Sequence, residues 1–308
     1  MKILINRRPV DGPWGGGNLL VKAFCSQMIK KGHTIIHKLE DDIDAIMLQD
    51  PRPESEGISI NEAVQYRVEN PKTKIIQRIN ECDARKNTKN VDDMLLECSK
   101  YIDATIFVSE WIKNYHLKNG WLCNNNHVIY NGINFDHFKK RKKKNNGKIN
   151  IVTHHWSNNV LKGFDVYDML DEFVNKNKEF SFSYIGRCRG TFKNTNVIKP
   201  LIGKNLGLEL SKYDVYVSAS RFDPGPNHIL ESLACEIPTY VFKDGGGCVE
   251  FAGSDHSYDS FDKLEEILKN RNFKNNNFVL CDWVSCINNF ENLILREVYI
   301  EDDRKQRH

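Results

Sequence analysis

Short apolar runs and amphipathic stretches alternate along most of this chain. Residues 2–6 (KILIN) form an unbroken apolar run, which is typical of a buried parallel strand. A glycine-rich loop follows at 12–17, and then helical apolar spacing runs from Asn18 to Lys31, where Gly32 can end a helix. The first 32 residues therefore predict a strand-loop-helix unit.

The same alternation continues to residue 138 and begins again at residue 149. In the first half, further strands are predicted at 33–39, 45–49, 74–79 and 104–109, with a helix at 91–102. In the second half, strands are predicted at 149–155, 180–186, 214–220 and 239–243, with helices at 162–175, 203–212, 227–235 and 261–269. Strands that alternate with helices predict an α/β fold with doubly wound parallel sheets.

A Lys- and Asn-rich stretch, KKRKKKNNGK, separates the two halves and cannot build a core. We therefore predict a first domain at 1–140 and a second at 141–280. Residues 281–308 have helical apolar spacing, and we expect this segment to pack across or return to the first domain. The basic run Lys139–Lys144 is usually a solvated linker, but it could also be drawn weakly to anionic lipid headgroups.

Composition narrows the class of protein without identifying a partner. The chain has 308 residues, 40% hydrophobic and 28% charged, as in ordinary globular proteins, and its formal charge of +3 gives no case for nucleic-acid binding. The nine cysteines are scattered singly, so reduced, mostly buried thiols are expected and a metal site is not. Without a signal core or a long apolar span, a cytoplasmic location is expected.

Six loops that follow predicted strands hold almost every unusual residue. Ligands of open parallel sheets bind beyond the carboxyl ends of the strands, so two such domains facing each other would gather these loops in one cleft. The loops are 12–18, 80–85, 154–163, 186–190, 221–227 and 244–250.

The segment after the strand at 214–220 is the most informative. A helix is predicted to begin near Asn227 after the turn Pro224-Gly225-Pro226, and its free N–H groups and positive dipole would suit a phosphate. Asp223 precedes the turn and Glu231 lies one helical turn inside. Both acids could simply favour the helix dipole, but that would not require so rigid a turn.

Basic residues after two other strands could reach the same anion. Lys162 precedes Gly163 at a helix start and could contact a diphosphate, although a surface lysine is the ordinary alternative. Arg187 has the same placement. His154 and His155 point in opposite directions from a strand end, so one could donate to a ligand while the other packs; we assign the ligand to His155.

The first half offers weaker candidates. Gly15, Gly16 and Gly17 allow close backbone approach to a ligand, or only a tight turn. They lack the full dinucleotide fingerprint, and no acid follows the second strand, so a nicotinamide oxidoreductase ranks last. The residues Arg78, Asn80, Asp83 and Arg85 could recognise a substrate or form a salt-bridged loop.

Together these motifs resemble the retaining GT-B glycosyltransferases often called glycosyltransferase family four. The similarity rests on five patterns: Gly15-Gly16-Gly17, Asn131-Gly132-Ile133-Asn134, Lys162-Gly163, Asp223 through Pro238 with Glu231, and Gly245-Gly246-Gly247 with Glu250. In this chain Asp223 stands where the family usually has Glu, and Glu236 stands where it has Gly.

The resemblance implies two Rossmann-like domains facing a cleft, and transfer of a sugar from a nucleotide-diphosphate sugar to an acceptor hydroxyl without a metal or other cofactor. It implies that Lys162 and the helix after Asn227 bind the diphosphate, that Glu231 binds the ribose, and that Asp223 lies near the transferred sugar. The family's first-domain histidine has no equivalent, so Asn80 or Asp83 is expected in its place. A nucleotide-sugar epimerase and a non-catalytic nucleotide-sugar binder are the alternatives.

Overall fold

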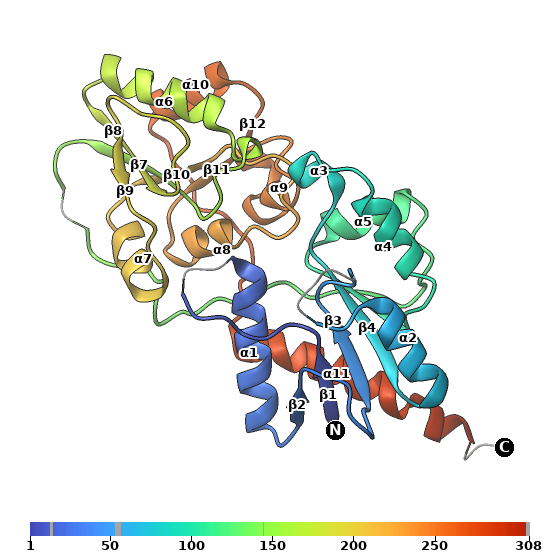
Figure 1. Ribbon diagram of the computed structural model, residues 1–308. Helices are drawn as coiled ribbons and strands as arrows, with labels where there is room; N and C mark the ends of the chain where they lie inside the picture. Colours follow the sequence, from blue (N-terminus) through green and yellow to red (C-terminus); the bar gives the residue numbers. More distant parts are fainter. Residues whose placement is uncertain (13–14, 53–56, 144, 306–308) are drawn as a thin grey trace. The chain divides into compact units, whose positions relative to one another are not determined.

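The computed structural model describes residues 1–12, 15–52, 57–143 and 145–305, with side chains as far as residue 299 (Figure 1). Pro13, Trp14 and Lys144, which belong to the predicted glycine loop and basic run, lie outside the described residues. The chain divides into two compact units. The first unit contains residues 1–83, 87–132 and 283 onward, and the second contains residues 84–86 and 133–282.

The first unit is built on a six-stranded sheet in the order β2-β1-β3-β4-β5-β6, with every neighbouring pair parallel. Its strands are β1 (Lys2–Ile5), β2 (Thr34–Ile36), β3 (Ala45–Leu48), β4 (Lys74–Ile79), β5 (Ala104–Phe107) and β6 (Asn126–Val128). Its helices are α1 (Gly16–Lys30), α2 (Ile60–Glu69), α3 (Asp83–Lys86), α4 (Val91–Cys98), α5 (Glu110–Lys118) and α11 (Trp283–Lys305). α3 extends from the first unit into the 84–86 segment of the second.

The second unit is a second six-stranded parallel sheet, in the order β12-β11-β10-β7-β8-β9. Its strands are β7 (Ile149–His155), β8 (Phe180–Gly186), β9 (Asn196–Ile198), β10 (Val215–Ser218), β11 (Thr239–Phe242) and β12 (Ser257–Tyr258). Its helices are η1 (Val160–Lys162), α6 (Phe164–Lys176), α7 (Gly203–Leu210), α8 (Asn227–Ala234), α9 (Gly247–Ala252), η2 (Ser254–His256) and α10 (Phe261–Asn270).

Strand order reverses between β7 and β10 in the second unit. β7 is the first strand of this sheet along the chain, and it pairs with β8 on one side and β10 on the other. In doubly wound sheets a ligand crevice opens at such a reversal, outside the carboxyl ends of the strands. The fold therefore marks one place in this unit for a site.

Aromatic side chains fill the core that supports this sheet. Tyr167, Phe182 and Tyr184 are fully or almost fully buried, and their rings pack at centroid distances of 5.8–6.0 Å. Such pairs contribute about 0.5–1.5 kcal/mol beyond the area they bury. The core therefore holds β7 and β8 rigidly against α6.

The units divide earlier than the predicted boundary at residue 140. Ile133 begins the second unit, and the chain returns to the first unit after Asp282. The two places where the chain passes between the units are hydrogen-bonded to each other, because Ile133 N–H donates to the Cys281 carbonyl at 2.9 Å. Residues 131–134, one of the five family patterns, therefore lie at the division itself.

The final helix, α11, belongs to the first unit and lies beside α1 (Figure 1). The Phe290 ring meets Phe24 edge-on at 6.0 Å, and Glu291 accepts from His33 at 2.9 Å and pairs with Lys31. The long-range return of this segment is thus held by both apolar and charged contacts.

Three cations of the basic run have partners inside the second unit. Lys140 pairs with Glu236, Arg141 donates to the carbonyls of His137 and Gly207, and Lys143 pairs with Asp214. Weak membrane contact through this run stays a prediction, and it would compete with these contacts. Among the described residues, no helix combines the length and apolarity required to cross a bilayer.

All nine cysteines are free thiols, and seven of them are buried, as the scattered pattern predicts.

Candidate functional site

Three loops of the second unit meet at the carboxyl ends of β7, β10 and β11. The chain segments are 154–163, 219–227 and 243–247. They are linked by backbone hydrogen bonds: Arg221 N–H donates to the Leu161 carbonyl at 2.8 Å, and Gly247 N–H donates to the Asp223 carbonyl at 2.8 Å. Parallel pairing brings all three segments to one edge of the sheet.

Lys162 and Asp223, predicted separately from two motifs, form an ion pair at this edge. Lys162 Nζ lies 2.5 Å from Asp223 Oδ2, and the two side chains are 16% and 7% exposed. Gly163 makes the approach possible: its φ is +87°, and a Cβ there would lie 2.3 Å from Ala219 Cβ and carbonyl oxygen. Only glycine fits at such a crossing of backbones.

The lysine determines the charge state of the buried acid. Burial by itself would raise the pKa of the Asp223 carboxyl, but the Lys162 ammonium lowers it, and the net pKa lies well below the ordinary 3.8. Asp223 is therefore a carboxylate at neutral pH. Removing either charge would leave the other buried without compensation.

The turn before α8 is fixed by the glycine loop that follows β11. Asp223 forms a parallel bridge with Gly246, whose φ of +66° and ψ of −124° suit only glycine. At Gly247 a Cβ would lie 2.7 Å from the Pro224 carbonyl oxygen. These contacts hold Gly225 and the start of α8 in place.

The α8 helix begins at the predicted residue, Asn227. Pro226 is its N-cap, and it provides no side-chain acceptor for the first-turn amides. Asn227 is half-buried. A helix start without a capping side chain is the arrangement in which an external anion can accept from backbone N–H groups.

Glu231, one turn inside α8, is bonded to the end of β7. His154 Nε2 lies 2.7 Å from Glu231 Oε2, and the two side chains are 8% and 12% exposed. His154 Nδ1 is buried and has no hydrogen-bond partner among the described residues. The histidine therefore orients one carboxylate oxygen of Glu231.

His155, which the sequence analysis assigned to the ligand, is instead part of the core. Its Nε2 lies 2.6 Å from the Tyr167 hydroxyl, and only 3% of the residue is exposed. Burial lowers the pKa of His155 well below its ordinary value, so the ring is neutral. Strand alternation explains the difference: His154 bonds to Glu231 of α8, and His155 bonds to Tyr167 of α6.

Arg187 and Glu250 lie on two further elements of the second unit. Arg187 is exposed after β8, and its guanidinium stacks over Trp156 at 4.1 Å. Glu250 lies in the first turn of α9 and is half-buried. Arg187 is on its predicted loop, whereas Glu250 belongs to a helix, and the binding roles of both stay predictions.

In the first unit, the glycine loop and the end of β4 come together. A Cβ at Gly17 would lie 3.7 Å from Asn80 Nδ2, and Gly16 begins α1. The Asp83 carboxylate is already hydrogen-bonded within the protein. It accepts from Val91 N–H, Asp92 N–H and the Thr88 hydroxyl at 2.8–3.2 Å. This carboxylate therefore caps the start of α4, which limits its freedom to act on a substrate.

No protein-family model matches the sequence, and no curated protein matches it. Solved structures do match over nearly the whole chain. HepE from Anabaena, in complex with UDP and glucose, is 9% identical and has a TM-score of 0.69, with 95% of this chain and 98% of that chain covered. Sucrose-phosphate synthase from Thermosynechococcus elongatus is 10% identical, with a TM-score of 0.64 and coverage of 100% and 99%.

AviGT4, a glycosyltransferase involved in avilamycin A biosynthesis, is 11% identical, with a TM-score of 0.61 and coverage of 96% and 98%. These similarities confirm the predicted fold. The chain has the GT-B fold. At such low identity the likeness concerns the architecture of the two Rossmann-like units.

One group of side chains in the second unit has the composition of a metal site. Ligand atoms of Asp223, His228 and Cys248 lie within 4.8 Å of one another. The Asp223 carboxylate is already paired with the Lys162 ammonium. Burial holds the pKa of the Cys248 thiol well above its ordinary value, which keeps the sulfur protonated. A cation would have to displace the ammonium and deprotonate the thiol, so the group is a poor fit to a metal.

Sequence reasoning missed several contacts of this site. They are the bond between His154 and Glu231 and the hydrogen bonds of His228 and Tyr167. Tyr167 OH accepts from Ala219 N–H at 3.0 Å and binds Thr153, which fixes the loop before Asp223. His228 Nε2 lies 3.0 Å from Ser218 Oγ. The adjacent histidines at 154 and 155 were a visible signal, but only the packing shows which one faces Glu231.

Proposed function

We propose that this protein is a glycosyltransferase that moves a sugar from a nucleotide-diphosphate sugar to an acceptor hydroxyl. One observation carries the proposal. Lys162, the uncapped start of α8 and Glu231 lie together at the strand reversal of the second sheet, in a GT-B fold. An ammonium and a helix N-terminus suit a diphosphate, and a carboxylate beside them suits ribose hydroxyls.

The leaving diphosphate would replace Asp223 as the ion-pair partner of Lys162. A diphosphate at the start of α8 carries more negative charge than one carboxylate, and the flexible four-carbon side chain of lysine can turn toward it. Charge that develops on the departing phosphate would then meet a preorganised ammonium and backbone N–H groups. Lys162 thereby supplies the positive charge of a metal-independent reaction.

The remaining donor contacts follow the same edge of the sheet. Glu231, oriented by His154, would accept from the ribose hydroxyls. Asp223 and the loop at Gly246 would lie near the transferred sugar, because the bridge between these two residues closes the turn beyond the diphosphate. Arg187 and Glu250 are further donor contacts in this proposal.

In the transfer step the bond between the anomeric carbon and the phosphate oxygen breaks, and a bond to the acceptor oxygen forms. The acceptor proton passes to the departing phosphate, so no separate base is required. Retention of anomeric configuration is part of the proposal. Asn80 is proposed on the acceptor side; Asp83, which caps α4, is a weaker candidate.

Donor binding can be tested with a panel of UDP-, GDP-, ADP- and TDP-sugars in thermal unfolding. A ligand present at 100 times its dissociation constant stabilises the native state by about 2.7 kcal/mol. Glu231→Gln should lose most of this stabilisation, whereas Glu266→Gln on the exposed face of α10 should keep it. No stabilisation by any nucleotide sugar in the panel would end the proposal.

Turnover then separates transfer from the alternative functions. With the stabilising donor and a panel of sugar acceptors, release of nucleoside diphosphate should fall about hundredfold or more in Lys162→Met and stay unchanged in Lys204→Met. Lys204 is exposed on α7 and provides the matched control. Conversion of the donor without any acceptor would indicate an epimerase, and binding without conversion would indicate a binder.

A further inference from the structure

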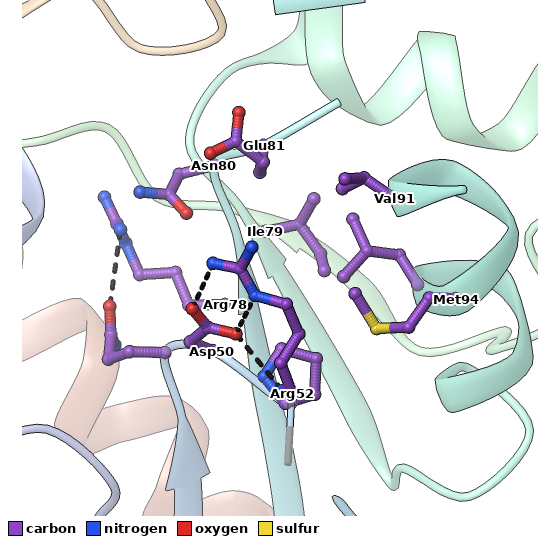
Figure 2. A pocket seen from close by; sticks show the side chains of 11 residues that line it. Asp50, Arg52, Arg78, Ile79, Asn80, Glu81, Val91 and Met94 are labelled. Carbon is purple, nitrogen blue, oxygen red and sulfur yellow. Dashed lines mark hydrogen bonds and ion pairs between the residues drawn. The ribbon is translucent and has the colours of Figure 1, made fainter. Parts of the chain in front are cut away.

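A pocket lies in the first unit, where β3 and β4 end beside α4 (Figure 2). Its cavity volume is about 50 Å³. The lining residues are Gln49, Asp50, Pro51, Arg52, Arg78, Ile79, Asn80, Glu81, Val91, Met94 and Leu95. Three apolar side chains of α4 form one wall, and the ends of the two strands supply charged and amide groups.

A buried arginine is the central charge of this pocket. Arg78 is 2% exposed, and its guanidinium donates to Asn131 Oδ1 at 2.8 Å and to Gln49 Oε1 at 3.4 Å. Both acceptors are neutral amides that fix the plane of the guanidinium. An arginine held this way is preorganised for bidentate contact with a planar or tetrahedral anion.

Gln49 offers this pocket a buried amide donor. Its Nε2 is buried and has no hydrogen-bond partner among the residues that the structure describes. An unsatisfied buried amide donor costs about 1–3 kcal/mol, so such groups normally face a ligand or an ordered water. The backbone of Gln49 is fixed, because its N–H donates to Asn6 Oδ1 at 2.7 Å.

The carboxylates of the pocket do not outweigh its arginines. Asp50 is paired with both Arg7 and Arg52, at 2.8 and 2.5 Å. Burial by itself would raise the pKa of Asp50, but Arg52 lowers it, so the group stays ionised. Among the lining residues the charges of Arg52 and Arg78 balance those of Asp50 and Glu81, and Arg7, which pairs with Asp50 from outside the lining, adds one positive charge.

The start of α1 adds to this positive field from the other side of Asn80. A Cβ at Gly17 would lie 3.7 Å from Asn80 Nδ2, so the N-terminal turn of this 15-residue helix adjoins the lining of the pocket. Figure 2 shows Asn80 above Arg78, on the same side of the strand ends. The donors that line this space therefore come from the ends of β3 and β4, and α1 lies beyond Asn80.

We propose that this pocket binds an anionic group carried by the acceptor, a phosphate or a carboxylate, so that the protein glycosylates acidic rather than neutral acceptors. The inference rests on the proposed function, since an acceptor is required. The volume of about 50 Å³ compares with the roughly 10–15 Å³ that one water needs by the same measure. It suits a compact anionic group, with the sugar ring of the acceptor outside the pocket.

The anion site is tested directly by NMR of the full-length chain, without any donor. Inorganic phosphate and acetate are titrated separately at constant ionic strength, and the Gln49 side-chain amide and Arg78 Nε signals are followed. We expect saturable shifts with at least one of the two anions, and the tighter one identifies the acidic group. Absence of saturable shifts with both anions would overturn the inference.

Gln49→Glu is the variant of choice because it keeps the size of the side chain and puts a carboxylate beside Arg78. It should weaken anion binding at least tenfold. Gln65→Glu, on the exposed face of α2, makes the same change in net charge and should leave binding within twofold of the original. Equal affinities in these two variants would show that the pocket is not the anion site.

Turnover with acidic acceptors separates this inference from the proposed function. Glucose 6-phosphate, glucuronate and glucose are compared as acceptors with the donor that stabilises the protein. We expect kcat/KM at least tenfold higher for one acidic sugar than for glucose, and loss of that preference in Gln49→Glu. Transfer with equal preference for all three overturns only the inference. Anion binding without transfer to any acceptor overturns the proposed function, and with it the acceptor role of the pocket, but leaves the anion site itself.

Discussion

At the scale of single residues, the Lys162–Asp223 pair is a structural element as well as a candidate for catalysis. Lys162→Met leaves a buried carboxylate without its counter-charge, and breaking such a pair costs about 3–5 kcal/mol. We therefore expect a large fall in the urea midpoint of the second unit. The double variant Lys162→Met/Asp223→Asn should recover much of that loss, because neither charge is then buried.

The exposed lysine at 204 provides the comparison for this experiment. Lys204→Met should change the free energy of unfolding by no more than about 0.5 kcal/mol, as surface changes usually do. If the double variant were as unstable as Lys162→Met alone, the pair would not be the source of the loss.

Asp223 also predicts a dependence of stability on pH. Its pKa in the folded protein lies below the ordinary 3.8, so the unfolded chain binds a proton more readily than the folded one. The stabilisation is fully present above the unfolded pKa and is lost as the pH falls through the folded pKa. Urea midpoints measured from pH 6 to pH 2 should therefore fall less steeply in Asp223→Asn than in the unaltered protein.

Other acids with lowered pKa values, such as Asp171, add to the acid sensitivity of both proteins. Only the difference between the two curves reports on Asp223. Parallel curves across the acid range would contradict an ionised, lysine-paired Asp223.

At the scale of elements, the turn between η1 and α6 depends on one glycine. Gly163→Ala places a Cβ 2.3 Å from Ala219 and requires a φ of +87°. The conformational cost alone is about 1–2 kcal/mol, and the steric overlap with backbone adds to it. We expect Gly163→Ala to lower the urea midpoint and to weaken nucleotide-sugar binding, because Lys162 moves with the turn.

Gly147→Ala separates the two costs. Gly147 also has a positive φ, +76°, but nothing lies within 4 Å of its Cβ position. This control should show the conformational cost alone and keep nucleotide-sugar binding. Equal effects of the two substitutions would mean that the contact with Ala219 is unimportant.

Elements with strong apolar periodicity were predicted from sequence, and short or polar ones were not. β7 and β8 have the predicted bounds, and α8 begins at the predicted Asn227. α2 and α5 were missed, although Ser59 and Ser109 cap them. β9 and β12 have three and two residues, so pairing with a neighbouring strand, rather than local propensity, determines them.

At the scale of the whole molecule, the last helix completes the core of the first unit. Phe290 is fully buried against Phe24 although 266 positions separate them in the sequence. Phe290→Ala should destabilise the first unit by about 3–5 kcal/mol. Hydrogen exchange should show lost protection around Phe24, with little change around Phe182 in the second unit.

Tyr299 provides a matched control at the far end of the same helix, because its side chain is 53% exposed. Tyr299→Ala should leave exchange in both units nearly unchanged. Lost protection that began in the second unit would contradict the assignment of α11 to the first unit.

The sequence by itself determined the two parallel α/β halves and the places of Asp223, Glu231 and Lys162, because apolar period and turn chemistry are local properties of the chain. The tertiary structure alone decided which of these residues touch. Alternation along β7 predicted that His154 and His155 diverge, but only packing against α6 and α8 assigned one to the core and the other to Glu231.

The same distinction applies to the first unit. Arg78 and Asn80 were recognised as a polar strand end, but the cavity beside them depends on α4 and on the end of β3, which arrive from distant parts of the chain. The boundary at Ile133 was likewise decided by contacts rather than by composition. Contacts between residues far apart in sequence leave no periodic trace in it, so only the folded chain reveals them.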